Sequence, residues 1–113
     1  LDRTFLADQF EVLGYARLHH LRHVFDMSAE ELFADIATAD GDHAGIKQAI
    51  HRLGSAAAAL GMSKLFEQCD RLEKTTGEDH FAPDISIPAL RRLERQSLAA
   101  LDDWLKETDL TLV

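Results

Sequence analysis

The stretch HRLGSAAAALG, residues 51–61, decides the fold because it joins a helical apolar stripe to a helix stop. At about 100° per residue, the apolar side chains in and just before it gather on one helix face: Ile46, Ile50, Leu53, Ala57 and Leu60. Gly61 follows the last of them and is expected to cap the helix. His51 projects from the opposite face, beside side chains that are all small: Ala44, Ser55, Ala58 and Ala59. The stretch therefore predicts an amphipathic helix that offers an imidazole to a closely approaching partner protein.

Helical periodicity continues on both sides of this stretch. Further amphipathic helices are predicted at residues 1–13, 15–38 and 63–75, and near the C-terminus. Ser28 could cap a new helix, so that the second helix bends or breaks near Asp26. Pro88 is expected in the first turn of the last helix, after a polar loop at residues 77–86. No segment alternates with period two, so the predicted fold is all-α: an up-and-down antiparallel four-helix bundle with a short extra N-terminal helix, forming one domain over residues 1–113.

The apolar stripes of the other helices supply the rest of the predicted core. In the second helix they are Leu18, Leu21, Val24 or Phe25, Leu32, Phe33 and Ile36. In the two C-terminal helices they are Leu65, Phe66, Cys69 and Leu72, then Leu90, Leu93, Leu98, Leu101, Trp104 and Leu105. A chain of 113 residues is long enough to bury such a core without disulfides.

Composition narrows the classes of partner. The net charge of −8 leaves too few cations to neutralise a nucleic-acid backbone, so no nucleic acid is expected. The chain has no cationic amphipathic stretch and no apolar run near the roughly 20 residues that span a bilayer, so no direct membrane contact is expected. We therefore expect a cytoplasmic domain. Because the chain begins with Leu1 rather than Met, we expect it to be a piece of a longer protein, whose remainder could be anchored in the inner membrane.

The pattern His-x-Leu followed by Leu60-Gly61, Cys69 and Leu72-Glu73 resembles the core of a histidine-containing phosphotransfer (HPt) domain of a bacterial phosphorelay. The specific part of the resemblance covers residues 47–73. It implies that His51 accepts a phosphoryl group and that Glu73, on the neighbouring helix, accepts a hydrogen bond from its ring. This chain departs from the usual His-x-Leu-Lys-Gly, because Gly54 stands at the Lys position and Ser55 at the Gly position.

The resemblance also implies the partners. Response-regulator receiver domains would donate and accept the phosphoryl group and would bring the Mg²⁺, so the chain itself needs no metal or cofactor. The sequence has no Gly-rich phosphate loop, so we expect neither ATP binding nor self-phosphorylation. The domain resembles the C-terminal module of a hybrid sensor histidine kinase, and in isolation it is expected to be a monomer.

A phosphoryl group on His51 calls for nearby cations or donors. Lys47, one turn earlier, is the first candidate to replace the missing Lys, with Arg52 and Lys64 as weaker ones. The Ser55 hydroxyl could donate to a phosphoryl oxygen. If the missing Lys matters, Gly54→Lys should restore transfer. The predicted docking surface around His51 comprises Ala44, Gly54, Ser55, Ala58 and Ala59.

Two other functions stay open on the sequence. The chain could be a docking module for receiver domains that has lost phosphate transfer, for which the missing Lys at Gly54 is the one favourable feature. It could also be a small metal-binding bundle, because His19 and His23 have the i, i+4 spacing that can chelate zinc or iron. No second His-rich helix supplies the other half of such a site, so solvated surface histidines are the favoured reading.

Overall fold

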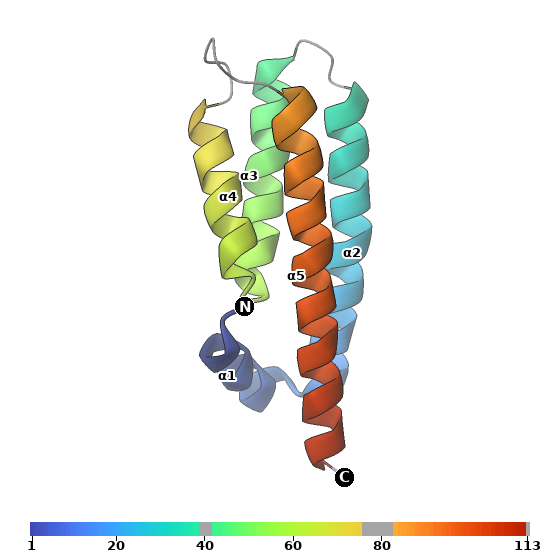
Figure 1. Cartoon of the computed structure of the whole chain (residues 1–113). Helices are drawn as coiled ribbons and strands as arrows, with labels where there is room; N and C mark the ends of the chain where they lie inside the picture. The colour runs from blue at the N-terminus through green and yellow to red at the C-terminus, as the bar shows by residue number, and fades with distance from the viewer. Residues whose placement is uncertain (39–41, 76–82, 113) are drawn as a thin grey trace.

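A computed structural model of the chain describes residues 1–38, 42–75 and 83–112, with side chains from 1–38, 42–75 and 86–108. These residues form helices and no strands: α1 (Arg3–Leu13), α2 (Tyr15–Thr38), α3 (His43–Ala59), α4 (Ser63–Thr75) and α5 (Pro83–Leu112). Helices α2 to α5 lie side by side and alternate in direction along the chain (Figure 1). The predicted all-α, up-and-down bundle with an extra N-terminal helix is therefore confirmed.

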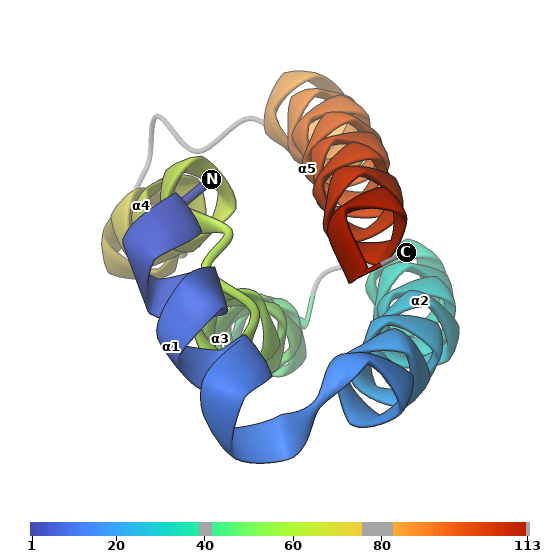
Figure 2. The ribbon, with the colours of Figure 1, turned by 90° about the horizontal axis from the view of Figure 1, so that it is seen from below.

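The four long helices form a ring in which each packs against its neighbours in the order α2, α3, α4, α5 (Figure 2). Helix α1 crosses the end of the bundle at which α3 gives way to α4. Leu6 is fully buried there, and the ring of Phe10 meets that of Trp104 edge-on, with 6.4 Å between their centroids. The Asp2 amide donates a hydrogen bond of 2.7 Å to the carbonyl of Gly61. These contacts attach α1 to the bundle.

The turn between α3 and α4 depends on Gly61, which has a φ of +68°. Its amide donates to the carbonyl of Ala58, and the amide of Met62 donates to that of Ala57. This pair of bonds is the Schellman arrangement that ends helices at a left-handed glycine. The predicted helix stop is thus present, two residues after Ala59, the last residue of α3. It returns the chain antiparallel, which brings residues of α4 alongside residues of α3 from the preceding turns.

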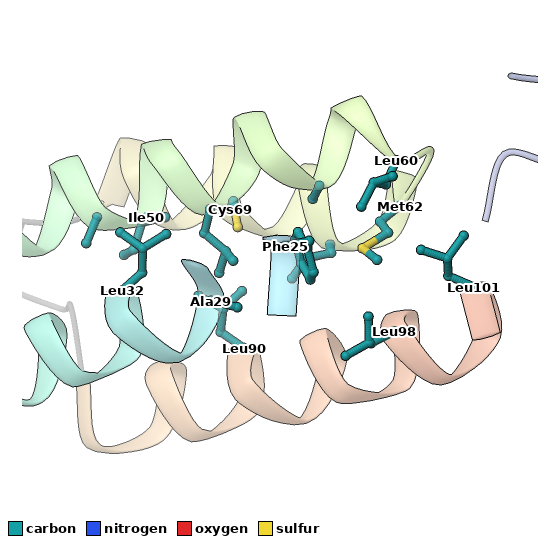
Figure 3. Packing of buried hydrophobic residues seen from close by; sticks show 14 of the residues in the cluster. Phe25, Ala29, Leu32, Ile50, Leu60, Met62, Cys69, Leu90, Leu98 and Leu101 are labelled. Atoms are coloured by element: carbon teal, nitrogen blue, oxygen red, sulfur yellow. The ribbon is translucent and has the colours of Figure 1, made fainter. Parts of the chain in front are cut away.

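The core lies on the inward faces of the four long helices (Figure 3). Most of the predicted apolar stripe is buried there, including Phe25, Leu53, Cys69 and Leu98. Two residues that the periodicity assigned to the core lie outside it: Leu21 and Phe66 are exposed, Phe66 to 44%. Of the alternatives Val24 and Phe25, Phe25 is the buried one. Conversely, the core stripe of α5 includes a carboxylate, because Glu94 is 0% exposed. The reason is that burial depends on which neighbour covers a face, and periodicity alone does not fix that.

Two predicted helix boundaries are wrong. Helix α2 continues through Ser28 without a break near Asp26, because Phe25 and Ala29 on either side of that point both pack into the core and keep the helix on one line. Helix α5 begins at Pro83, so Pro88 lies inside it rather than in its first turn. Residues 83–86 of the predicted loop are therefore helical, and the rest of that loop lies outside the described residues.

Candidate functional site

His51 lies midway along α3 with a side chain that is 63% exposed. Its Nδ1 is 3.0 Å from Oε2 of Glu73, whose side chain is partly covered on α4. The two residues are 22 positions apart in sequence, and the antiparallel turn at Gly61 brings them together. The contact expected between them is present.

This contact fixes which ring nitrogen is nucleophilic. A carboxylate only accepts hydrogen bonds, so in the neutral imidazole Nδ1 carries the proton and donates it to Glu73. The lone pair then lies on Nε2. A carboxylate behind an imidazole also holds the orientation of the ring. In the neutral ring the arrangement therefore presents an oriented Nε2 lone pair on an exposed side chain, which is what an imidazole needs in order to act as a nucleophile.

An open hollow of about 320 Å³ lies beside the imidazole, between α3 and α4. It is lined by Lys47, His51, Gly54, Ser55, Phe66, Cys69, Asp70, Glu73 and Lys74. Lys47 and Ser55 were predicted as phosphate contacts, and both line the hollow. The weaker candidates, Arg52 and Lys64, are exposed and do not line it.

Lys74 and Asp70 are residues of the hollow that the sequence reasoning missed. Nζ of Lys74 donates a hydrogen bond of 2.9 Å to Oδ2 of Asp70. This hydrogen bond and the charge of the Asp70 carboxylate raise the pKa of Lys74. A signal was available: Asp70 is three residues before Glu73 and four before Lys74, so it shares a face of α4 with each of them.

The docking surface predicted around His51 is only partly exposed. Ala44, Ser55, Ala58 and Ala59 are exposed as expected, but Gly54 is buried. The cause is α4, which crosses so close that a Cβ atom on Gly54 would lie 3.0 Å from the Cβ of Cys69. Gly54 is therefore a contact between two helices and not part of the exposed surface.

Cys69 forms part of the hollow's floor but is not a second nucleophile. The residue is buried, and burial together with the negative charge of Glu73 raises the pKa of its thiol to about 12. At neutral pH the sulfur therefore stays protonated and unreactive.

The histidines of α2 belong to no cluster of metal-ligating side chains in the part of the chain that the structure describes. His19 and His23 are exposed, and the ring of His19 meets that of Tyr15 edge-on. Among the side chains that the structure describes, no group of three or more His, Cys, Asp or Glu residues is placed to hold a metal ion. None of the described helices combines the length and the apolar character needed to cross a membrane.

Comparison of the sequence with protein-family models gives one match. The family model described as Hpt domain matches residues 20–109, which include all of α3 and α4 and most of α2 and α5. The chain belongs to the Hpt domain family. No curated protein and no solved structure matches the chain. Membership implies a histidine phosphotransfer role in a phosphorelay and interaction with receiver domains of response regulators. In this Hpt domain, α1 lies outside the matched span.

Proposed function

We propose that His51 is the phospho-acceptor of this Hpt domain, taking a phosphoryl group from a receiver-domain aspartate and passing it to the aspartate of a second receiver. The observation that carries the proposal is the 3.0 Å contact between Nδ1 of His51 and Oε2 of Glu73. The side chain of His51 is 63% exposed, so its other nitrogen remains accessible. Family membership supports the proposal further. The two helices that carry His51 and Glu73, α3 and α4, lie wholly within the span that the family model matches.

The transfer step needs no proton from the protein. The Nε2 lone pair attacks the phosphorus of the aspartyl phosphate, a P–N bond forms, and the P–O bond breaks with its electron pair leaving on the receiver carboxylate. The positive charge that develops on the imidazole ring lies opposite the Glu73 carboxylate, which stabilises it. Onward transfer reverses these bonds, and the pair returns to Nε2. Any Mg²⁺ is proposed to come with the receiver domain.

The small residues around His51 give the receiver room to approach. Ser55, Ala58 and Ala59 are exposed on the turns after it, and Ala44 is exposed two turns before it. None of these side chains reaches beyond the imidazole, so an acidic active site can close over Nε2.

We propose that residues 1–113 form one domain, since α1 packs on the bundle through Leu6. We also propose that this domain is monomeric and is a cytoplasmic module of a hybrid sensor kinase.

The second candidate is a docking module that binds receivers without accepting phosphate. The observation in its favour is that Gly54 is buried against α4, so the family's Lys position cannot supply a cation here. Both candidates predict receiver binding. They differ in whether His51 becomes phosphorylated.

The deciding experiment is transfer from a labelled phospho-receiver domain with Mg²⁺, comparing wild type, His51→Gln and His20→Gln. His20 is an exposed histidine on α2 and serves as the matched control. We expect acid-labile, base-stable label on the wild type and on His20→Gln, and none on His51→Gln. Unfolding free energies should agree within about 0.5 kcal/mol, because His51 is exposed. If several receivers bind the wild type but leave it unlabelled, the docking module is the better description.

A further inference from the structure

The positive charge in the hollow beside His51 comes from lysines at positions other than 54, where the family usually has its Lys. Position 54 cannot carry a cation into it, because Gly54 is packed against Cys69. Two lysines line the hollow instead, Lys47 from α3 and Lys74 from α4. Lys74 follows Glu73 directly, so the residue that orients the imidazole and this ammonium come from the same turn of α4.

The charges in the hollow are balanced before transfer. Two carboxylates, Asp70 and Glu73, face two ammonium groups, Lys47 and Lys74. Glu73 is engaged by His51, and Asp70 is engaged by Lys74 at 2.9 Å. A phosphoryl group brings about two further negative charges and three strong acceptor oxygens. The hollow then carries excess negative charge, and the phosphoryl oxygens compete with the two carboxylates for the ammonium groups.

We propose that Lys74 binds the phosphoryl group on His51 and that Asp70 holds the Lys74 ammonium beside the hollow until the group arrives. This inference rests on the proposed phosphorylation of His51. An exposed lysine–carboxylate pair exchanges at little cost, because water screens it and the lysine stem is flexible. A phosphoryl group offers twice the charge of a carboxylate and more acceptors, so it displaces Asp70. While Asp70 holds the Lys74 ammonium, this hydrogen bond and the charge of Asp70 raise the pKa of Lys74, so the group is charged when the phosphoryl group arrives.

The test uses phosphoramidate as the donor, so that no receiver surface contributes to the rate. In this reaction a P–N bond forms to Nε2 of His51, the P–N bond of phosphoramidate breaks, and ammonia leaves. Lys74→Met should slow labelling about tenfold, the loss expected for one charge-assisted contact to phosphate. Lys74→Arg should stay within about twofold of the wild type, because it keeps the charge and the donors. Arg71→Met is the matched control: Arg71 is an exposed cation on the same helix, pairs with Glu67 and does not line the hollow.

A double variant separates a direct contact from a general change in charge. Asp70→Asn should accelerate labelling because it releases Lys74, but it should have no such effect in the Lys74→Met background. If Asp70→Asn accelerates both backgrounds equally, or Lys74→Met labels at the wild-type rate, Lys74 does not bind the phosphoryl group and the proposal is overturned.

Titration of the phosphorylated chain by ³¹P NMR gives a readout that does not depend on rates. A cation against the phosphoryl group favours its dianion, so Lys74→Met should raise the pKa of the phosphoryl group while Arg71→Met leaves it unchanged. An unchanged phosphoryl pKa in Lys74→Met counts against the contact. Absence of any His51-dependent label on the wild type, from phosphoramidate and from receivers alike, overturns the proposed function as well, so the two failures are distinguishable.

Discussion

A Cβ atom on Gly54 would lie 3.0 Å from the Cβ of Cys69, so the close approach of α3 and α4 depends on a glycine three residues after His51. Cβ of Cys69 is attached rigidly to the α4 backbone and cannot rotate away. Any side chain at position 54 must therefore push the two helices apart by a few tenths of an ångström. The same two helices carry His51 and Glu73, whose 3.0 Å contact depends on their spacing.

Gly54→Lys should consequently destabilise the domain and fail to improve phosphate transfer. Replacing a helical glycine normally gains up to about 1 kcal/mol of helix propensity. Overpacking a tight helix contact costs about 1–3 kcal/mol, and we expect this cost to exceed the gain. Urea unfolding should show a lower midpoint for Gly54→Lys and for Gly54→Ala. Ser55→Lys, at the exposed neighbouring position, is the control and should lie within about 0.5 kcal/mol of the wild type. A Gly54→Lys domain as stable as the wild type would contradict the tight contact.

The sequence predicts this site better than it predicts the surface around it. The 3.6-residue period of α3 places Ile50 and Leu53 inward, which leaves His51 between them pointing outward, and the structure agrees. Position 54 lies on the border of that apolar stripe. Whether such a border residue is covered depends on how closely α4 approaches, which no pattern within α3 records. A residue without a side chain gave no apolar signal, although its small size is what permits the contact with Cys69.

The misassigned aromatic residue has the same explanation. Phe66 has the spacing of a core residue next to Leu65, yet it lines the hollow beside His51 with 44% of its surface exposed. Leu65, the residue before it, is 0% exposed and takes the inward position at that level of α4. Glu94 is the opposite case, since its charge argues for the surface while its register with Leu90 and Leu98 puts it in the core. In both cases the position in the bundle determines burial, although the polarity of the side chain would favour the opposite outcome.

Removing the carboxylate behind the imidazole should change the ring's tautomer. In Glu73→Ala, Nδ1 of His51 loses its acceptor, so the proton is no longer held on that nitrogen. ¹⁵N NMR of the imidazole should show Nδ1–H in the wild type and a shift towards Nε2–H in Glu73→Ala. Phosphorylation by phosphoramidate should slow about 10–100-fold, the usual cost of losing a carboxylate that orients an imidazole.

Glu73→Gln provides the matched comparison for this effect. Its amide oxygen can still accept from Nδ1–H, so the tautomer should be kept while the negative charge is lost. We expect a phosphorylation rate between those of the wild type and Glu73→Ala. Equal rates in all three proteins, with the same tautomer, would show that Glu73 does not orient His51.

Cys69 should resist thiol reagents until the domain unfolds. With its pKa raised to about 12 by burial and by the charge of Glu73, about one thiol in 10⁴ is ionised at pH 8. The unfolded chain, at the ordinary value of 9.0, ionises about one in ten. Labelling with a maleimide should therefore follow the fraction unfolded in a urea series. Rapid labelling of the folded domain would mean that α3 and α4 separate readily around Gly54.

The buried carboxylate of α5 should make stability depend on pH. Glu94 is 0% exposed and accepts no hydrogen bond in the described structure, although Nε of Arg95 lies 3.3 Å and Nη1 of Arg91 lies 3.8 Å from its Oε2. Both arginines are also paired with acidic residues of α2: Arg91 with Glu30, and Arg95 with Asp26 and Glu30. Burial raises the pKa of Glu94, the charge of Arg91 lowers it, and that of Asp26 raises it, for a net increase.

The sign of the effect follows from that increase. The folded chain holds the Glu94 proton more tightly than the unfolded chain, so the stabilisation is complete below the ordinary value of 4.5 and is lost as pH rises through the folded-state pKa. Glu94→Gln mimics the protonated form at every pH and should be more stable than the wild type at pH 7 by about 1–3 kcal/mol. The difference should shrink towards zero as the pH falls below 4.5. Urea unfolding of both proteins from pH 4 to pH 8 measures it, with Glu31→Gln as an exposed control whose difference from the wild type should stay small. A Glu94→Gln domain less stable than the wild type at pH 7 would mean that attraction to Arg91 and Arg95 outweighs burial.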